Sequence, residues 1–345
     1  MKRTTVILSV ILIAVVIIAL AYTISLYVPF DLTPQKETIT VVDYTGVYVE
    51  VEVPLERIVS IIATETICML GHGDKIVGRG LLSTDSEVIL PQSILDLPMV
   101  AESSFSPNLE LILELEPDLV LVDEGLSDEN REILENAGVP VMNDMLMAPR
   151  RNTFIKNLGL ILGAEEKADE FIEYEEYYEN LVMERTANLT SSDKPSFYFE
   201  WYMPWFSAAA GSEYHDLLVE AGGINIAAGE PVLFPTLSPE YVAEENPDFI
   251  VRMSTYLDGE DLPSFQALRD EVLSRAALSE SNAVKDGEVY IIKNTVLVTR
   301  RPIGLLYLAK WFHPDLFEDI DPATVHTQMI QQFFGADLQG VFVYP

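Results

Sequence analysis

A motif that joins an acidic residue to a downstream Pro-Asp occurs twice in this sequence. Residues 106–120 are Ser-Pro-Asn-Leu-Glu-Leu-Ile-Leu-Glu-Leu-Glu-Pro-Asp-Leu-Val, and residues 238–251 are Ser-Pro-Glu-Tyr-Val-Ala-Glu-Glu-Asn-Pro-Asp-Phe-Ile-Val. In each copy a glutamate, Glu110 or Glu240, lies in the first turn of a predicted short helix, seven residues before the proline. Helix capping and the helix dipole explain the residue types of either copy alone, but not the same spacing twice. We therefore expect two related lobes that present matched carboxylates.

An aromatic segment directly follows one predicted strand. The strand 196–202 runs into Trp201-Tyr202-Met203-Pro204-Trp205-Phe206. We expect this segment at the carboxyl edge of the second lobe's sheet, which is where open α/β sheets bind ligands. The rings of Trp201, Tyr202 and Trp205 are suited to stack on a planar macrocycle or an aromatic chelate. The alternative is a hydrophobic plug between helix and sheet.

Polar residues follow predicted strands of the first lobe. Thr64 and Glu65 come after the strand 57–61, and Ser83 and Thr84 come after the next strand. These four residues are candidate ligand contacts for the same reason as the aromatic segment. Thr64 is equally well explained as a helix cap.

A basic pair stands out in the acidic second lobe. Arg300 and Arg301 directly precede a predicted helix at 302–311. Guanidinium groups there suit carboxylate, catecholate or phosphate oxygens of a ligand. A local salt bridge to a nearby acid explains the pair equally well. Tyr256, after the strand 249–253, is a further candidate ligand contact.

The sequence offers no motif for catalysis or for a bound metal ion. Cys68 is the single cysteine, which excludes an internal disulfide and a cysteine-based metal cluster. The four histidines are far apart, and no Gly-x-Ser-x-Gly or Gly-Lys-Ser/Thr motif occurs. Ser212 and His215 are close in sequence, but they lie at an ordinary capped helix start. We predict a binding protein that is not an enzyme and has no cofactor or metal site of its own.

The net charge excludes one class of partner. The chain has 55 acidic and 21 basic residues, for a formal net charge of −34. A field this negative repels phosphate backbones, so we expect no nucleic-acid binding. The acidity is better explained by solubility in a salty medium.

The N-terminus predicts a location outside the cytoplasm. Lys2 and Arg3 precede an uncharged apolar stretch at residues 4–30, which is long enough to cross a bilayer. The stretch is either an uncleaved membrane anchor or a signal peptide that is cleaved near residues 19–21 (Ala-Leu-Ala). No cysteine follows it directly, which excludes lipid attachment by the bacterial lipoprotein route. Asn188 begins an Asn-Leu-Thr glycosylation sequon in a position expected to be exposed.

Alternating short strands and helices predict an α/β protein of two parallel-sheet lobes. A hairpin is expected at 38–53, and nearly uninterrupted helical patterns at 153–162 and 164–189 predict long connecting helices with a break at Gly163. The predicted organisation is a signal or anchor at 1–30, a linker at 31–37, an N-terminal lobe at 38–149, connecting helices at 150–193, and a C-terminal lobe with a tail at 194–345. The tail from residue 326 is expected to pack on a lobe, and no function is assigned to it.

Several short motifs, taken together and in order, resemble one known family. They are Pro-Leu-Glu-Arg-Ile-Val at 54–59, Leu-Gly-His-Gly-Asp-Lys-Ile-Val-Gly at 70–78, Asn-Leu-Glu at 108–110, Glu-Pro-Asp-Leu-Val at 116–120, Leu-Leu-Val-Glu-Ala-Gly-Gly-Ile-Asn at 217–225, Asn-Pro-Asp-Phe-Ile at 246–250, Ala-Val-Lys-Asp-Gly-Glu-Val-Tyr at 283–290, and Leu-Ala-Lys-Trp-Phe-His-Pro at 308–314. This series is similar to the extracytoplasmic substrate-binding proteins of ABC importers for iron–siderophore, haem and cobalamin complexes. The resemblance covers about residues 38–321.

The resemblance implies a fold, a ligand class and partners. The fold is two α/β lobes joined by a long rigid helix, with the ligand held between the lobes. The implied ligand is a metal chelate, with an iron–siderophore expected first and cobalamin or haem as alternatives. The implied partners are an ABC permease and its ATPase, which a monomer meets through one surface glutamate per lobe, at Glu110 and Glu240. The alternatives are an anchored surface module without transport and an extracytoplasmic enzyme.

Overall fold

The computed structural model describes residues 36–123, 125–144, 150–255, 258–259 and 261–345, apart from the side chain of Thr84. The chain divides into two units, residues 1–37 and 38–345, and the fold below is that of the second unit. The predicted anchor at 4–30 and the candidate Tyr256 lie outside the described residues. No helix in the described part of the chain is both long enough and apolar enough to cross a membrane.

The first sheet is parallel and has five strands. In spatial order they are β5 (Met99–Ala101), β4 (Ile76–Gly80), β3 (Ile58–Ser60), β6 (Leu119–Val122) and β7 (Val141–Asn143). The chain winds outward from β3 to β5 and then returns to the other side of β3, so the strand order reverses between β3 and β6. Its helices are α2 (Thr64–Met69), α3 (Thr84–Ile89), α4 (Gln92–Leu95), α5 (Leu109–Glu114) and α6 (Asp128–Asn136).

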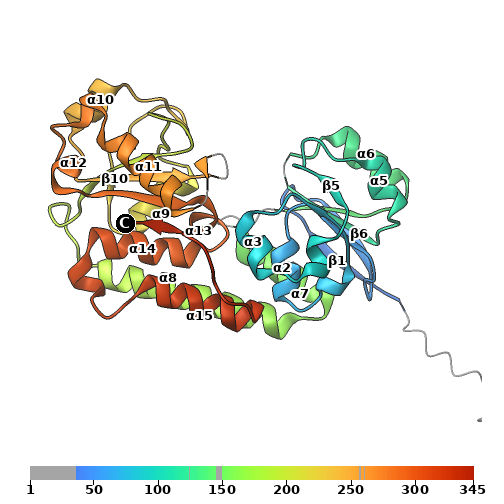
Figure 1. The fold of residues 1–345 in the computed structure, drawn as a ribbon. Coiled ribbons are helices and arrows are strands. Elements are labelled where there is room, and N and C mark those ends of the chain that lie inside the picture. The colour runs from blue at the N-terminus through green and yellow to red at the C-terminus, as the bar shows by residue number, and fades with distance from the viewer. Residues whose placement is uncertain (1–35, 124, 145–149, 256–257, 260) are drawn as a thin grey trace, which may run out of the picture. The chain divides into compact units, whose positions relative to one another are not determined.

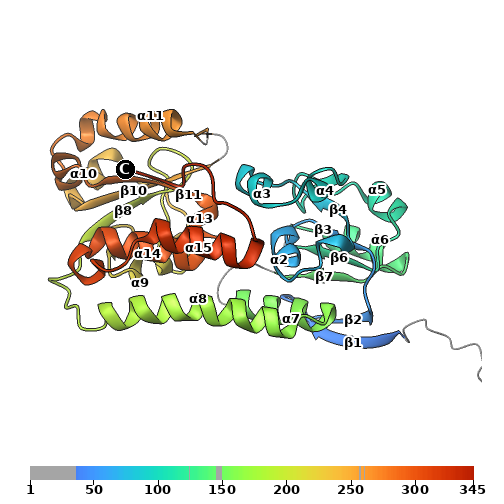
Figure 2. The ribbon, with the colours of Figure 1, turned by 60° about the horizontal axis from the view of Figure 1, so that its bottom comes forward.

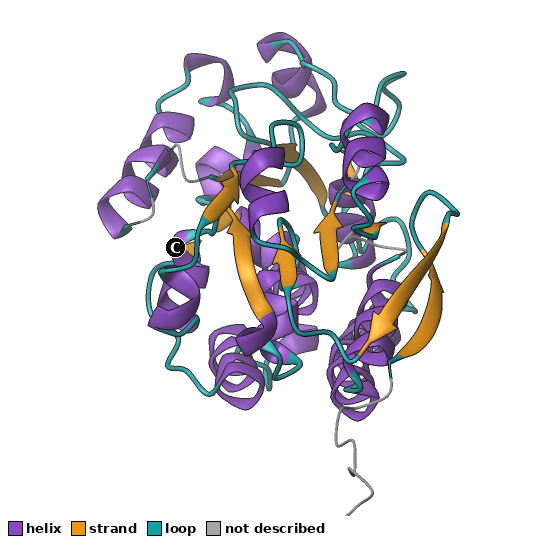
Figure 3. Ribbon diagram, turned by 90° about the vertical axis from the view of Figure 1, so that its right-hand side faces the viewer, coloured by secondary structure: helices purple, strands orange, loops and turns teal. Residues whose placement is uncertain are grey.

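The second sheet repeats this arrangement, and the α/β fold of two parallel-sheet lobes is confirmed (Figure 1). In spatial order its strands are β12 (Val343–Tyr344), β11 (Val289–Lys293), β10 (Phe249–Ser254), β8 (Ser196–Glu200) and β9 (Ile224–Asn225). Here the strand order reverses between β8 and β10, and only β12 is antiparallel. Its helices are α9 (Glu213–Glu220), α10 (Pro239–Glu245), α11 (Leu262–Leu273), α12 (Asn282–Asp286), α13 (Asn294–Leu297), α14 (Arg301–Phe312) and α15 (Pro322–Phe334). Helices lie on both sides of the strands (Figure 3).

The doubled motif adopts the same backbone geometry in both lobes. Glu116 and Asn246, each directly before the proline, have positive φ angles of 44° and 47°. Asp118 then accepts a hydrogen bond from the backbone N–H of Arg57 at 2.9 Å, and Asp248 accepts one from the backbone N–H of Ser196, also at 2.9 Å. Each Pro-Asp therefore ties the strand that follows it to the amino end of the neighbouring strand. The predicted relation between the lobes extends to individual hydrogen bonds.

The helix starts of the two copies differ from the expectation in one detail. Ser238 caps α10 by accepting a hydrogen bond from the backbone N–H of Tyr241 at 3.1 Å. In the first copy Asn108 performs this role for α5, and Ser106 lies two residues outside the cap. The difference arises because α5 begins at Leu109, directly after Asn108, whereas α10 begins at Pro239, directly after Ser238. Both Asn and Ser are favoured capping residues.

Two consecutive helices connect the lobes, as expected (Figure 2). Helix α7 (Arg151–Leu162) ends at Gly163, whose φ of 66° breaks the helical path, and the 22-residue α8 (Glu165–Thr186) follows. A buried ion pair between Arg151 and Glu175, 2.8 Å long, joins the two helices. Helix α8 packs along α14 of the second lobe. The predicted hairpin is also present, as β1 (Glu37–Val42) and β2 (Tyr48–Val53).

The C-terminal tail contacts both lobes. Helix α15 packs on α14 and also on α2 of the first lobe, and β12 then adds an antiparallel strand to β11. Phe333, near the end of α15, stacks edge-on against Phe171 of α8 at 4.9 Å between ring centres. The tail therefore reinforces the connection that α8 makes.

Candidate ligand-binding and docking sites

The carboxyl edges of the two sheets meet at a buried ion pair. Asp85, in the first turn of α3, follows the carboxyl end of β4, and Lys293 is the last residue of β11. The Asp85 Oδ1 atom lies 2.6 Å from the Lys293 Nζ atom, and each side chain is 4% exposed. The hydroxyl of Thr295 donates a further hydrogen bond to Asp85 Oδ2. The loops that follow the strands of the two lobes are therefore brought to the same part of the molecule, where this class of sheet binds ligands.

Trp201 is the centre of an aromatic cluster at the carboxyl end of β8. Its ring lies 4.5 Å from the ring of Phe234, 4.9 Å from that of Tyr202 and 5.4 Å from that of Phe206, measured between centres. Residues 206 and 236 form an antiparallel bridge that brings the two contributing segments together. We call Trp201, Tyr202, Phe206 and Phe234 the aromatic cluster. It lies at the point where the strand order of the second sheet reverses.

The aromatic cluster is partly core and partly surface. Trp201 is half-buried and packs on the main hydrophobic core, as a plug would. Tyr202 and Phe234 remain 38% and 36% exposed, and the neighbouring side chains of Val232, Leu233 and Met203 are exposed as well. The core packing of Trp201 is that of the predicted plug, and the exposed face of the cluster leaves the ligand role a prediction.

Trp205 belongs to a different surface from Trp201. Its φ angle of 67° turns the chain, and its ring packs with Tyr198 against the core on the other face of the sheet. The guanidinium of Arg275 lies 4.8 Å from the centre of the Trp205 ring, in a cation–π contact. The structure therefore does not bring Trp205 together with Trp201 and Tyr202.

A buried charged network supports the turn that carries the aromatic cluster. Glu200 is fully buried and forms ion pairs with Arg275 at 2.6 Å and with Arg252 at 3.1 Å. Arg252 donates in turn to the backbone carbonyls of Trp201 and Tyr202. Burial opposes the charge of Arg275, but hydrogen bonds to Glu200 and Glu271 raise the pKa of this guanidinium. The position of Trp201 is thus set by groups that are closed to solvent.

The polar candidates of the first lobe whose side chains are described already form hydrogen bonds with nearby residues of the same lobe. The Thr64 hydroxyl is buried and donates to the carbonyl of Ser60 at 3.3 Å, while Ala63 is the capping residue of α2. Ser83 caps α3 by accepting from the backbone N–H of Ser86 at 3.1 Å. Glu65 is half-buried and accepts a hydrogen bond from the Ser86 hydroxyl. The side chain of Thr84 lies outside the described residues.

Arg300 is closed to solvent. It is 1% exposed, and its Nη1 atom lies 3.7 Å from Asp85 Oδ2 and 3.2 Å from His326 Nε2. Burial, and then the charge of Arg300, lower the pKa of His326 to about 3, so the ring is neutral at physiological pH. A cavity of about 20 Å³ beside Arg300 has room for about one water molecule.

Arg301 has two carboxylate partners in the structure. Its Nη1 atom lies 2.6 Å from Glu179 of α8, and its Nη2 atom is paired with Glu220 of α9. This is the salt-bridge arrangement that the sequence left open beside the ligand role. It ties the start of α14 to the connecting helix.

Glu110 and Glu240 occupy equivalent positions on the surface. Each is the second residue of its helix, α5 or α10, and each side chain is exposed. Neither forms an ion pair with any described residue of the chain. Asn188 is also exposed, in the turn after α8.

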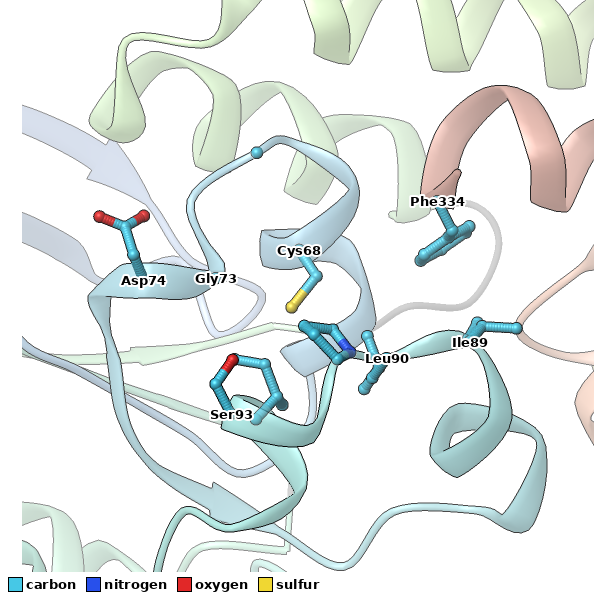
Figure 4. Close-up of a pocket in the computed structure, with 10 residues that line it drawn as sticks. Cys68, Gly73, Asp74, Ile89, Leu90, Ser93 and Phe334 are labelled. Atoms are coloured by element: carbon cyan, nitrogen blue, oxygen red, sulfur yellow. The ribbon is translucent and has the colours of Figure 1, made fainter. Parts of the chain in front are cut away.

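A cavity lies in the first lobe, away from the aromatic cluster (Figure 4). It measures about 370 Å³ and is bounded by α2, by the turn that precedes β4 and by the segment 89–94, with Phe334 of α15 at one side. Cys68 points into this space, and burial raises the pKa of its thiol to about 12, which favours the protonated thiol over the thiolate at neutral pH. No group of three or more His, Cys, Asp or Glu side chains in the described residues could hold a metal ion.

Sequence reasoning missed several residues of the two carboxyl edges. Phe234 and Phe105 are exposed aromatic residues in loops without regular periodicity. Lys293 and Asp85 are 208 residues apart, so no local pattern links them. The one signal available for Phe234 was its place in an apolar loop segment, Val-Leu-Phe, between two prolines at 231 and 235.

Comparison with known proteins agrees with this architecture. A family model described as periplasmic binding protein matches residues 61–296. An uncharacterized ABC transporter substrate-binding lipoprotein of Bacillus subtilis, YvrC, is 24% identical over 81% of this chain and 87% of its own length. The vitamin B12-binding protein of Yersinia pestis is 27% identical over 61% of this chain and 74% of its own.

Solved structures share the fold. The molybdate periplasmic binding protein MolA of Haemophilus influenzae, bound to molybdate, superposes with a TM-score of 0.73 at 18% identity, covering 88% of this chain and all of that one. The FepB protein of Veillonella parvula gives the same TM-score at 22% identity, covering 89% and 99%. With the family model matching more than half of the sequence, the chain belongs to the periplasmic binding protein family.

Proposed function

We propose that this protein is the extracytoplasmic solute-binding component of an ABC importer and that it captures a metal chelate. The observation that carries the proposal is the meeting of the two carboxyl edges at Asp85 and Lys293, with the aromatic cluster at the end of β8. A ligand held there contacts loops of both lobes at once. The names of the Bacillus and Yersinia relatives, a substrate-binding lipoprotein of an ABC transporter and a vitamin B12-binding protein, support the same role.

Delivery to the permease is assigned to Glu110 and Glu240. An exposed carboxylate that meets an arginine of another protein makes a charge-assisted and often bidentate contact. Both acids are exposed, and both occupy the second position of a short helix. Each also precedes a Pro-Asp clamp, the Pro-Asp pair whose aspartate ties two neighbouring strands together. One such contact per lobe suits a permease with two equivalent subunits, with the ATPase acting on its cytoplasmic side.

The membrane attachment that we propose differs in kind from that of the Bacillus relative, which is named a lipoprotein. Cys68, the single cysteine here, belongs to helix α2 and is no lipid attachment site. The apolar stretch at 4–30 is the proposed anchor, or a signal peptide if it is cleaved. Asn188 is exposed and is a proposed glycosylation site on the outside of the cell.

The candidates for the chelate are an iron–siderophore, a corrinoid and haem. The full chain purified from its native membrane should carry a metal in a ratio near one per protein, with an absorption spectrum that separates the three classes. A preparation that contains neither metal nor chelate under ligand-replete growth, and that binds none on addition, would contradict the proposal.

A further inference from the structure

We infer that the ligand carries no net negative charge and presents an apolar face to the aromatic cluster, so that it is an uncharged or cationic chelate. The inference rests on the proposed function and narrows its ligand class. It follows from where the cations of the chain lie and from what they already bind.

The cations at the carboxyl ends of the strands are used by the fold itself. Arg79 of β4 donates to the backbone carbonyls of Ile94, Gly80 and Leu95. Arg252 of β10 is 3% exposed and paired with Glu200. Lys293 of β11 is 4% exposed and paired with Asp85. An anionic ligand would have to take these groups from the partners that they already have in the fold.

The arginine pair before α14 offers no better anion site. Arg300 is 1% exposed, and the cavity beside it is too small for any chelate. The side chain of Arg301 is 13% exposed and has two carboxylates, Glu179 and Glu220, within ion-pair distance. Each guanidinium is thus already held near an acid of the protein.

The exposed cations of the described chain lie elsewhere. They precede strands at their amino ends or lie on helices: Lys36, Arg57, Lys156, Lys167 and Lys285. Near the carboxyl edge of the first lobe the exposed charges are acidic, at Glu102 directly after β5 and at Glu87 in α3. The formal net charge of −34 for the whole chain also disfavours the approach of an anion.

The loops at the carboxyl edges of the two sheets expose apolar side chains. On the second lobe Val232, Leu233 and Phe234 are 56%, 50% and 36% exposed. On the first lobe Leu81, after β4, is 54% exposed and Phe105, after β5, is 79% exposed. Exposed apolar groups concentrated at a sheet edge are typical of a ligand surface. Burying them gains free energy only if the ligand brings an apolar face of its own.

Calorimetric titration of the full chain in detergent tests the inference with four probes of different charge. Cyanocobalamin is uncharged, ferrioxamine B is cationic, haemin carries anionic propionates, and molybdate is a small dianion. We expect cyanocobalamin or ferrioxamine B to bind about tenfold or more tightly than either anionic probe. Tighter binding of haemin would overturn the inference and leave the chelate function intact. Tighter binding of molybdate, which is an oxyanion and no chelate, would overturn both the inference and the chelate function. Failure of all four probes to bind would remove the chelate function and the inference with it.

Two variants link the preference to the aromatic cluster. Phe234→Ala should weaken the preferred probe about tenfold, while Tyr48→Ala, which removes a more exposed aromatic ring from the hairpin, should not change its affinity. Leu233→Lys should shift the preference toward haemin, and Leu233→Gln should not. An unchanged charge preference in Leu233→Lys would contradict the assignment of this surface as the ligand site.

Discussion

The Asp85 carboxylate and the Lys293 ammonium, 208 residues apart in sequence, form a 2.6 Å ion pair in which both side chains are 4% exposed. The pair joins the first turn after β4 of one lobe to the last residue of β11 of the other. Two further groups of the second lobe contact the Asp85 carboxylate: the Arg300 guanidinium at 3.7 Å and the Thr295 hydroxyl, which donates a hydrogen bond. A single carboxylate of the first lobe therefore neutralises charge that the second lobe buries.

Removing this carboxylate should destabilise the fold. In Asp85→Asn, Lys293 and Arg300 lose the charge that compensates their burial, and the free energy of unfolding should fall by about 3 kcal/mol. Glu280→Gln is the matched control, because its ion pair with Lys285 is 2.9 Å long but exposed. The free energy of unfolding, measured by urea denaturation, should fall by less than about 1 kcal/mol in the control. Equal losses of unfolding free energy in the two variants would show that the buried pair stabilises the fold no more than an exposed pair does.

Glu213 should make stability depend on pH in the opposite sense from most carboxylates. Burial raises the pKa of Glu213 to about 7, and the charge of Arg301 offsets this only in part. The folded state therefore holds a proton that the unfolded chain releases, so the contribution of Glu213 is most favourable below about pH 4.5 and is lost as the pH rises to 7.

Glu213→Gln should remove this dependence. The variant should be more stable than the parent at pH 8, by on the order of 1–3 kcal/mol, and nearly equal to it at pH 4. Denaturant unfolding at several pH values measures the difference. A constant difference across this range would contradict a raised pKa for this carboxyl group.

The two Pro-Asp clamps should contribute similarly to stability. Asp118→Ala and Asp248→Ala each remove hydrogen bonds to the backbone at the amino end of a neighbouring strand, which should cost about 1–3 kcal/mol apiece. Asp286→Ala, at an exposed position in α12, is the control and should be nearly neutral. A large loss of unfolding free energy in only one of the two variants would show that the two copies of the motif do not contribute equally to stability.

Ligand addition should change the overall dimensions of the protein little. The lobes are joined by the 22-residue helix α8, by the buried Asp85–Lys293 pair and by α15, which packs on α2. Small-angle scattering with and without the preferred chelate measures the radius of gyration. A large decrease on binding would indicate hinge closure, which these contacts oppose.

The sequence predicted those features that local patterns encode. Strand–helix alternation gave the two sheets, and the break at Gly163 gave the division between α7 and α8. The doubled motif predicted that the two lobes are related. The relation extends to the backbone, because Glu116 and Asn246 both have positive φ angles. Each of these is set by residues within about a dozen positions of one another.

The rest depends on contacts between distant residues. The partners of Arg301 are 122 and 81 residues away, so a salt bridge and a ligand contact could not be separated from the sequence. The opposite placement of Trp201 and Trp205 follows from the positive φ of Trp205, which no residue type there signals. Strands of two or three residues, such as β5 and β9, are too short to show a periodicity.

Stimulation of the cognate transporter is the most direct measurement of the proposed role. In proteoliposomes that contain the permease and ATPase, the double variant Glu110→Ala/Glu240→Ala should abolish the stimulation of ATP hydrolysis while the affinity for the chelate stays unchanged. The matched control is Glu114→Ala/Glu244→Ala, which removes exposed acids from the same two helices and should stimulate like the parent. Full stimulation by the Glu110/Glu240 double variant would contradict docking through these two acids.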